Sequence, residues 1–175
     1  ADDYGIPSEA PTRLDFNAFS VERADWIHAN SIDYNETLDQ ILISSPRFNE
    51  LWIIDHGTTT EEAAGPAGDL LYRWGNPQIY GRGGPEDQIL WGNHDALWVL
   101  DGTPGAGNIT IFNNGMDRPE GAISTIEELT PPLLPDGTYA IVEGDAWMPH
   151  ATDTVFQYDP PEDFFSRFIS GGMRL

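Results

Sequence analysis

The 175-residue sequence contains no cysteine and no lysine. Without cysteine, the chain has neither a disulfide framework nor thiolate chemistry at a metal or redox site. Its 8 basic residues are all arginine and oppose 29 Asp and Glu, so the formal net charge is −21. So acidic a chain repels the phosphates of nucleic acids and anionic membrane surfaces, and we expect neither as a partner.

Long hydrophobic runs are also missing. No stretch approaches the roughly 18 apolar residues of a membrane span, so we expect no insertion into a membrane. No segment keeps an apolar period of 3.6 over about eleven residues, which argues against long helices. Hydrophobic residues still make up 39% of the chain, with six Trp, six Tyr and eight Phe, which is ample for a core. The acidic residues are scattered rather than gathered in one tail, so disorder is not indicated.

What the chain has instead is a repeat that begins with histidine. Each copy consists of four short apolar stretches separated by turn residues, and closes on aromatic residues at alternate positions. The first copy reads HANSIDYN, DQILISSP, NELWIID and DLLYRWGNP, and the second reads HDALWVLDG, GNITIFNNG, AISTIEEL and TVFQYDPP. Four strands per unit at such a period are typical of the blades of a β-propeller.

The predicted fold is therefore all-β, a partial β-propeller. We expect an extended lead-in over residues 1–25 and a propeller domain over 26–175, with blades at 26–77 and 91–161 and the start of the next at 164–175. Propellers usually need about four to eight blades to close. We therefore expect a fragment, or one piece of a larger assembly that is completed by the rest of its own propeller or by further copies.

The pattern also predicts individual strands and loops. Residues 39–45 alternate, with Ile41 and Ile43 on one face and Gln40, Leu42 and Ser44 on the other, whereas 50–55 is apolar on both faces. We expect loops at 56–68 and 75–93, and at most one helical turn at 126–129.

His28 and His94 open the two copies. A lone histidine beside aromatic residues is more often a hydrogen-bonded structural residue than a catalyst, but nothing in core packing requires imidazole at the same place in successive blades. We predict that both lie on innermost strands and face a central channel. Neighbouring side chains on a strand point to opposite faces, so Asp95 is expected to be a structural hydrogen-bonding residue.

The remaining histidines and arginines give weaker signals. His56 and His150 lie in loops without a repeat counterpart, and we interpret both as structural or exposed. Arg118 follows the second strand of its copy, where its planar fork suits a sulfate, phosphate or carboxylate, although a surface ion pair explains it equally well. Arg73 and Arg167 stand inside strand patterns, where ion pairing is expected.

No motif indicates a cofactor or a metal. The glycines of 81–84 and 103–108 match neither the dinucleotide nor the Walker phosphate loop. Serine-hydrolase, zincin and EF-hand spacings are absent as well.

Longer stretches carry a more specific signal. Six stretches, in their order along the chain, resemble the bacterial arylsulfotransferase family of cofactor-independent aryl-sulfate sulfotransferases. They are RADWIHANSIDYN, LDQILISSPRFNELWIIDHGTTTEEAAG, GDLLYRWGNPQIYGRG, HDALWV, GAGNITIFNNG and DFFSRFISGGMRL. The resemblance runs from about residue 23 to the C-terminus and implies a six-bladed propeller.

The resemblance implies sulfuryl transfer from a phenolic sulfate ester to a phenol through a sulfated histidine, without a cofactor. By motif, His28 and His94 look like channel histidines and Arg118 like the sulfate-binding arginine. The counterpart of the sulfated histidine would lie beyond Leu175. The family also implies a periplasmic or extracellular location. A non-catalytic extracellular propeller, acting as a binding or structural module, is the alternative, because a fold does not guarantee a reaction.

Overall fold

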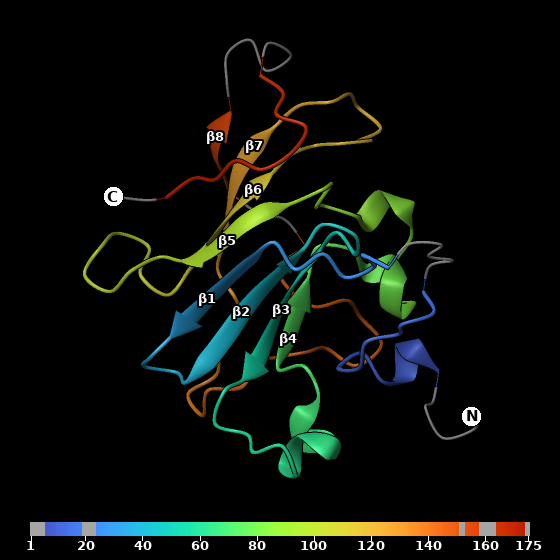
Figure 1. Ribbon diagram of the computed structural model, residues 1–175, viewed down its shortest axis with the longest axis vertical. Coiled ribbons are helices and arrows are strands. Elements are labelled where there is room, and N and C mark those ends of the chain that lie inside the picture. Colours follow the sequence, from blue (N-terminus) through green and yellow to red (C-terminus); the bar gives the residue numbers. More distant parts are fainter. Residues whose placement is uncertain (1–5, 19–23, 151–152, 158–163, 174–175) are drawn as a thin grey trace.

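Two four-stranded antiparallel sheets make up the protein, each a meander in chain order (Figure 1). The computed structural model describes residues 6–18, 24–150, 153–157 and 164–173. The first sheet contains β1 (Ser31–Asn35), β2 (Gln40–Ser45), β3 (Glu50–Asp55) and β4 (Tyr72–Trp74), and the second contains β5 (His94–Trp98), β6 (Ile109–Asn113), β7 (Thr125–Leu129) and β8 (Asp153–Gln157). The all-β class is confirmed.

Helical structure in the described residues is limited to single 3-10 turns. These are η1 (Pro7–Glu9), η2 (Glu62–Ala64), η3 (Pro66–Gly68), η4 (Pro77–Tyr80) and η5 (Pro85–Asp87). All begin with proline except η2, which begins with Glu62, and all lie in the lead-in or in the two predicted loops. Within the described ranges, no helix has the length and apolar character needed to cross a membrane.

The strands follow the alternation in the sequence. Gln40, Leu42 and Ser44 form the buried face of β2, whereas Ile41 and Ile43 are half-buried, as predicted. The first four residues of β3 are all buried. Residues 126–129, which the repeat places in its third apolar stretch and for which the sequence allowed at most one helical turn, form no helical turn: they belong to β7, which pairs with both β6 and β8. Two neighbouring strands outweigh the helix propensity of a single IEEL segment.

The two sheets meet at their first strands, which run parallel. The Asn30 amide donates to the carbonyl of Asn93 (2.8 Å), and the backbone N–H of Ala96 donates to Ser31 Oγ (3.0 Å). Further along, the N–H of Trp98 donates to Asp33 Oδ2 (2.8 Å). Contacts between the sheets are concentrated at β1, β2 and β5. The outer strands therefore diverge from this shared edge.

A long connection between β7 and β8 packs against the outer part of the first sheet. We call residues 130–150 the strap (Figure 1, orange-brown). Tyr139 donates to Gln40 Oε1 (2.7 Å), Tyr72 donates to the carbonyl of Met148 (2.7 Å), and Trp74 Nε1 donates to that of Pro149 (2.6 Å). Buried side chains of the strap thus continue the core of both sheets.

The lead-in is tied down by a buried arginine. Arg73 on β4 pairs with Glu50, which confirms the expected ion pair, and its Nη1 donates to the carbonyls of Arg13 (3.0 Å) and Pro11 (3.4 Å). A buried guanidinium needs acceptors for its N–H groups, and the lead-in supplies two of them.

The repeat predicts that a third unit opens at 164–175, of which the structure describes residues 164–173. Residues 164–173 contain no strand, and Ile169 and Ser170 have φ values of 59° and 84°, which are incompatible with extended backbone. The segment instead lies along the second sheet, where the N–H of Gly172 donates to Asp95 Oδ2 (3.1 Å). Asp95 is thus a structural hydrogen-bonding residue, as predicted. Residues 158–161 of the expected second unit and 174–175 lie outside the described residues.

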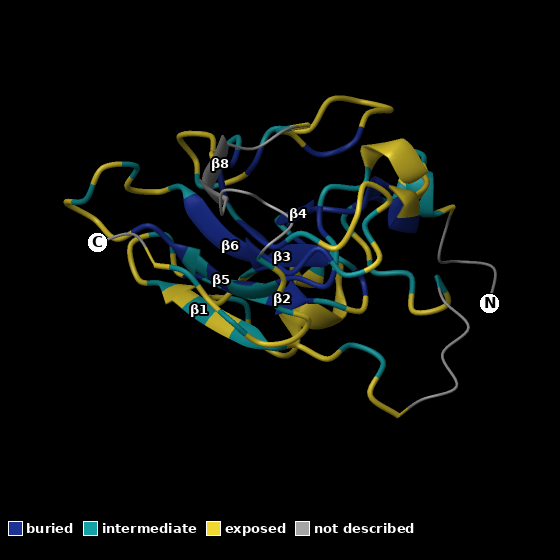
Figure 2. Cartoon of the chain, turned by 90° about the horizontal axis from the view of Figure 1, so that it is seen from above, coloured by how far each residue is buried: buried dark blue, intermediate teal, exposed yellow. Residues whose placement is uncertain are grey.

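One face of the first sheet is open. Ser31 and Asp33 bond to β5, so the alternate residues Ile32 and Tyr34 point away from the second sheet, and they are 68% and 48% exposed. Figure 2 shows this alternation along β1. An apolar strand face of this kind is suited to packing against another sheet.

Candidate functional site

Three candidate residues lie at the same end of the two sheets. Because β1 and β5 run parallel, the ends at which they begin coincide. His94 is the first residue of β5 and pairs with Phe112 near the end of β6, so the β6–β7 loop that carries Arg118 lies at that end too. His28 precedes β1 at the same end. We call this the histidine end of the molecule.

His94 is half-buried and held through one ring nitrogen. Its Nδ1 lies 2.8 Å from Asn114 Oδ1 and 3.0 Å from the carbonyl oxygen of Gly92. Both oxygens are acceptors, so Nδ1 carries the hydrogen. In the neutral ring, Nε2 then keeps its lone pair and is the atom left to accept a proton or to attack an electrophile.

His28 does not lie on a strand, so this part of the prediction is wrong. It stands three residues before β1, is exposed, and has a φ of 48°, which places it in the left-handed region rather than in extended backbone. Its Nδ1 lies 2.6 Å from Asp25 Oδ2, and Arg47 Nη2 approaches the same oxygen at 3.9 Å. His28 is therefore a loop residue held by a carboxylate, again through Nδ1.

Arg118 has a buried donor without a partner. Its Nε is buried and finds no acceptor among the described residues. The alternative interpretation was a surface ion pair, and the described part of the chain contains none with Arg118, not even with the nearby Asp117 or Glu120. An unpaired buried donor costs about 1–3 kcal/mol, and more when the group is charged, so a small anion at this position would satisfy it.

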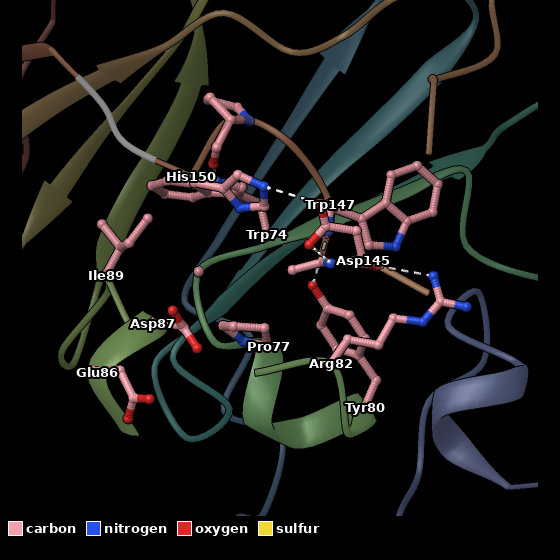
Figure 3. A pocket seen from close by; sticks show the side chains of 13 residues that line it. Trp74, Pro77, Tyr80, Arg82, Glu86, Asp87, Ile89, Asp145, Trp147 and His150 are labelled. Carbon is pink, nitrogen blue, oxygen red and sulfur yellow. Dashed lines mark hydrogen bonds and ion pairs between the residues drawn. The ribbon is translucent and has the colours of Figure 1, made fainter. Parts of the chain in front are cut away.

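Two cavities lie elsewhere on the first sheet, and none of the three candidates lines either of them. The smaller, about 170 Å³, lies between the loop after β4 and the strap; its walls include Trp74, Tyr80, Asp87, Asp145 and His150 (Figure 3). Burial raises the pKa of Tyr80 to about 12, so its hydroxyl stays protonated at neutral pH.

The second cavity is wider, about 660 Å³, and is lined mostly by residues of the lead-in and of 76–88, among them the amides Asn17, Asn76 and Gln78. Its Asn49 accepts the N–H of Gly92 (2.7 Å), so this groove borders the segment that leads into His94.

The other histidines and Arg167 have local partners. His56 pairs with Asp39 (2.6 Å) and His150 with Asp145 (3.4 Å), and all four side chains are about half-exposed, in agreement with the structural interpretation. Arg167 does not lie in a strand; its guanidinium stacks over the ring of Phe168 (5.2 Å). Among the described residues, no three His, Asp or Glu side chains are grouped so as to hold a metal ion.

Sequence reasoning missed the residues that orient the histidines. Asn114 follows β6 within an Asn-Asn-Gly triplet, which by composition indicates only a turn. Asp25 lies three residues before His28, a spacing that could have suggested a local pair. Arg47 lies in the β2–β3 turn, which is the turn of the first sheet equivalent to the β6–β7 loop that carries Arg118.

The architecture defines an all-β protein in which repeated four-stranded meanders pack side by side and present histidine and arginine at one end. Residues 6–140 match the family model described as Arylsulfotransferase (ASST). No curated protein and no solved structure matches the chain. The match covers well over half of the sequence, and the chain belongs to the arylsulfotransferase family.

Proposed function

We propose that this protein transfers a sulfuryl group from a phenolic sulfate ester to a phenol acceptor, by way of a sulfated histidine and without a cofactor. Membership of the family supports sulfuryl transfer in general. The observation that carries the proposal is that His94, His28 and Arg118 lie at one end of the two sheets, and that the buried Nε of Arg118 has no partner among the described residues. In a molecule with a net charge of −21, a cationic donor left unpaired is suited to an anionic group.

In the proposed reaction, a histidine nitrogen attacks sulfur while the bond from sulfur to the phenolic oxygen breaks. The phenolate leaves with the bonding electron pair and takes a proton from a neighbouring acid. An acceptor phenol then attacks the same sulfur, loses its proton and releases the histidine. The family pattern assigns the attacking histidine to a position beyond Leu175, so His28, His94 and Arg118 bind the sulfate and move protons.

Each residue has a chemical reason for its part. Arg118 stays charged throughout, and it offsets negative charge on the sulfuryl oxygens. His94 presents Nε2 as an acceptor, because its Nδ1–H is already used. His28 is solvent-exposed beside Asp25, where it can exchange protons with water.

We infer that the two sheets are blades of a propeller. The parallel packing of β1 on β5 supports this, and so does the bond from Gly172 to Asp95, which resembles the bond from Trp98 to Asp33 between the two sheets. The open face of Ile32 and Tyr34 is suited to a preceding blade. Under this proposal the two blades keep the bounds expected from the repeat, 26–77 and 91–161, whereas residues 164–173 lie along the second sheet without forming a strand. The rest of the ring comes from the same protein or from further copies.

We place the protein outside the cytoplasm, in the periplasm or the extracellular space, because its acidic, lysine-free composition suits a saline setting and the family resemblance implies export. Cell fractionation tests this; recovery of the intact protein only from the cytosol would contradict it.

The direct test of the reaction is release of p-nitrophenolate from p-nitrophenyl sulfate by the full-length protein, with and without a phenol acceptor. We expect release to depend on the acceptor and to follow ping-pong kinetics. Absence of turnover in folded protein with intact histidines would instead support the alternative, a propeller that binds ligands or partners without catalysis.

A further inference from the structure

Asn114 is fully buried, and its side-chain amide is oriented without ambiguity. Its Nδ2 donates to two backbone carbonyls, those of Ser166 (2.7 Å) and Ile169 (3.0 Å). The backbone carbonyl of Asn114 separately accepts from Ser124 Oγ (2.8 Å). Carbonyl oxygens only accept, so the NH₂ group must face residues 166–169 and Oδ1 must face His94.

This orientation determines which nitrogen of His94 carries the hydrogen. A free neutral imidazole prefers hydrogen on Nε2, yet here Nδ1 faces two oxygens, Asn114 Oδ1 at 2.8 Å and Gly92 O at 3.0 Å. A lone pair on Nδ1 would be repelled by both. We propose that Asn114 is a positioning residue that holds His94 in the Nδ1–H tautomer and directs Nε2 toward the substrate. This arrangement depends on the packing of residues 166–169 against Asn114.

The side-chain amide of Asn114 also couples the tautomer of His94 to the position of residues 166–169. If residues 166–169 moved away, Nδ2 would lose both acceptors, and the Asn114 side chain would be free to rotate its NH₂ group toward His94. A donor at that place favours a lone pair on Nδ1 and therefore the opposite tautomer. The segment that follows the second sheet thus controls the chemical state of a residue at the start of that sheet.

A neighbouring asparagine provides a matched control. Asn113 is equally buried and also links chain segments, because its Oδ1 accepts the N–H of Trp91 (2.9 Å) and its Nδ2 donates to the carbonyl of Ile89 (2.9 Å). It makes two hydrogen bonds to backbone and none to His94. A purely structural loss should therefore appear in both variants, whereas a change in tautomer should appear only for Asn114.

The experiment measures the ring ¹⁵N chemical shifts of His94 in labelled protein, at a pH where the ring is neutral. We expect the wild type and Asn113→Ala to show the Nδ1–H tautomer, and Asn114→Ala to show a mixture. An Nε2–H ring in the wild type would overturn the proposal. So would an unchanged ring in Asn114→Ala, because the Gly92 carbonyl would then be sufficient alone.

Asn114→Asp keeps the acceptor for Nδ1–H but removes both donors, and it serves if the alanine variant does not fold. We expect it to retain the tautomer while the amide hydrogens of Ser166 and Gly172, which donate to Ser124 and Asp95, exchange faster with solvent. Unchanged exchange in this variant would contradict the coupling to residues 166–169.

The catalytic meaning of the tautomer rests on the proposed function. We expect Asn114→Ala to lower kcat by about 10- to 100-fold with little change in KM, the range seen when residues that orient a functional histidine are removed. The spectra do not depend on turnover. An inactive wild-type protein with an Nδ1–H ring would refute the function and leave the positioning role intact.

Discussion

Arg73 Nη2 lies 2.6 Å from Glu50 Oε2, and neither side chain has any exposed surface. A second bond joins Arg73 Nε to Glu50 Oε1 (3.0 Å), and Trp52 Nε1 donates to Oε2 (2.8 Å). Burial raises the pKa of the Glu50 carboxyl, and the adjacent Arg73 charge opposes this shift. The guanidinium also stacks on the ring of Tyr80 (4.4 Å). The pair links β3, β4 and the lead-in in the interior of the first sheet.

Removal of one partner should be strongly destabilising. We expect Arg73→Met to lower the free energy of unfolding by about 3–5 kcal/mol, because the Glu50 carboxylate would be left buried without its cation. Urea denaturation measures the change. The exposed pair of Arg13 and Asp69 (3.4 Å) is the control, and Arg13→Met should produce a much smaller effect. Equal losses in the two variants would contradict a special role for the buried pair.

A surface carboxylate offers a prediction about pH. Asp39 accepts hydrogen bonds from Tyr34 (2.8 Å) and His56 (2.6 Å), and these hold the pKa of its carboxyl below the ordinary 3.8, with Tyr34 as the larger cause. Since the folded-state pKa is lowered, the contribution of Asp39 to stability is present above the unfolded value and is lost as the pH falls through the folded value. That window lies below about pH 4.

Tyr34→Phe should therefore raise the pKa of Asp39 toward 3.8, and an NMR titration of its carboxyl carbon measures the midpoint. Asp136 is the internal control, because its pKa is lowered by Thr138 and not by Tyr34. Its midpoint should not change. If both carboxyls shifted together, the cause would be a general change in fold or charge rather than the lost hydrogen bond.

The strap can be tested through its buried tryptophan. Trp147 is 4% exposed, and its ring lies 5.5 Å from that of Tyr72 in an edge-on arrangement. We expect Trp147→Ala to lower the free energy of unfolding by about 3–5 kcal/mol, as is usual when a large core side chain is removed. The adjacent Met148 is 37% exposed, so Met148→Ala should cost much less. Thermal or urea unfolding separates the two, and a comparable cost would mean that the strap is not part of the core.

Much of the fold could be predicted from local patterns. The alternation at 40–45 and the apolar run at 50–55 predicted β2 and β3. Successive side chains of a strand point to opposite faces, so the burial of each face can be read from every second residue. The IEEL segment of β7 was left open between the third stretch of the repeat and a single helical turn, because its conformation depends on pairing with strands on both sides. The strap could not be foreseen, since Tyr139 reaches Gln40 across 99 residues with no motif to connect them.

The sequence nominated the candidate residues but did not predict their geometry. The repeat identified His94, and the structure places it at the start of β5. The repeat also suggested an equivalent strand position for His28. This prediction is wrong because the backbone at His28 is left-handed, and no residue type in WIHAN indicates such a conformation. The partners Asp25 and Asn114 were missed for a related reason: an amide or carboxylate orients a ring only through exact placement in three dimensions.

The strongest test of the site is Arg118, whose buried Nε has no acceptor among the described residues. A charge-assisted hydrogen bond to sulfate is worth roughly 1.5–3 kcal/mol, and each 1.36 kcal/mol is about tenfold in rate. We therefore expect Arg118→Ala to slow sulfuryl transfer by about 10- to 200-fold while the urea midpoint stays near that of the wild type, since Arg118 takes part in no ion pair with another described residue. Arg118→Lys should recover only part of the rate, because a point charge does not reproduce the planar fork of a guanidinium. Arg13→Ala, which removes an arginine of the lead-in, should leave the rate unchanged. A wild-type rate in Arg118→Ala would remove this residue from the site.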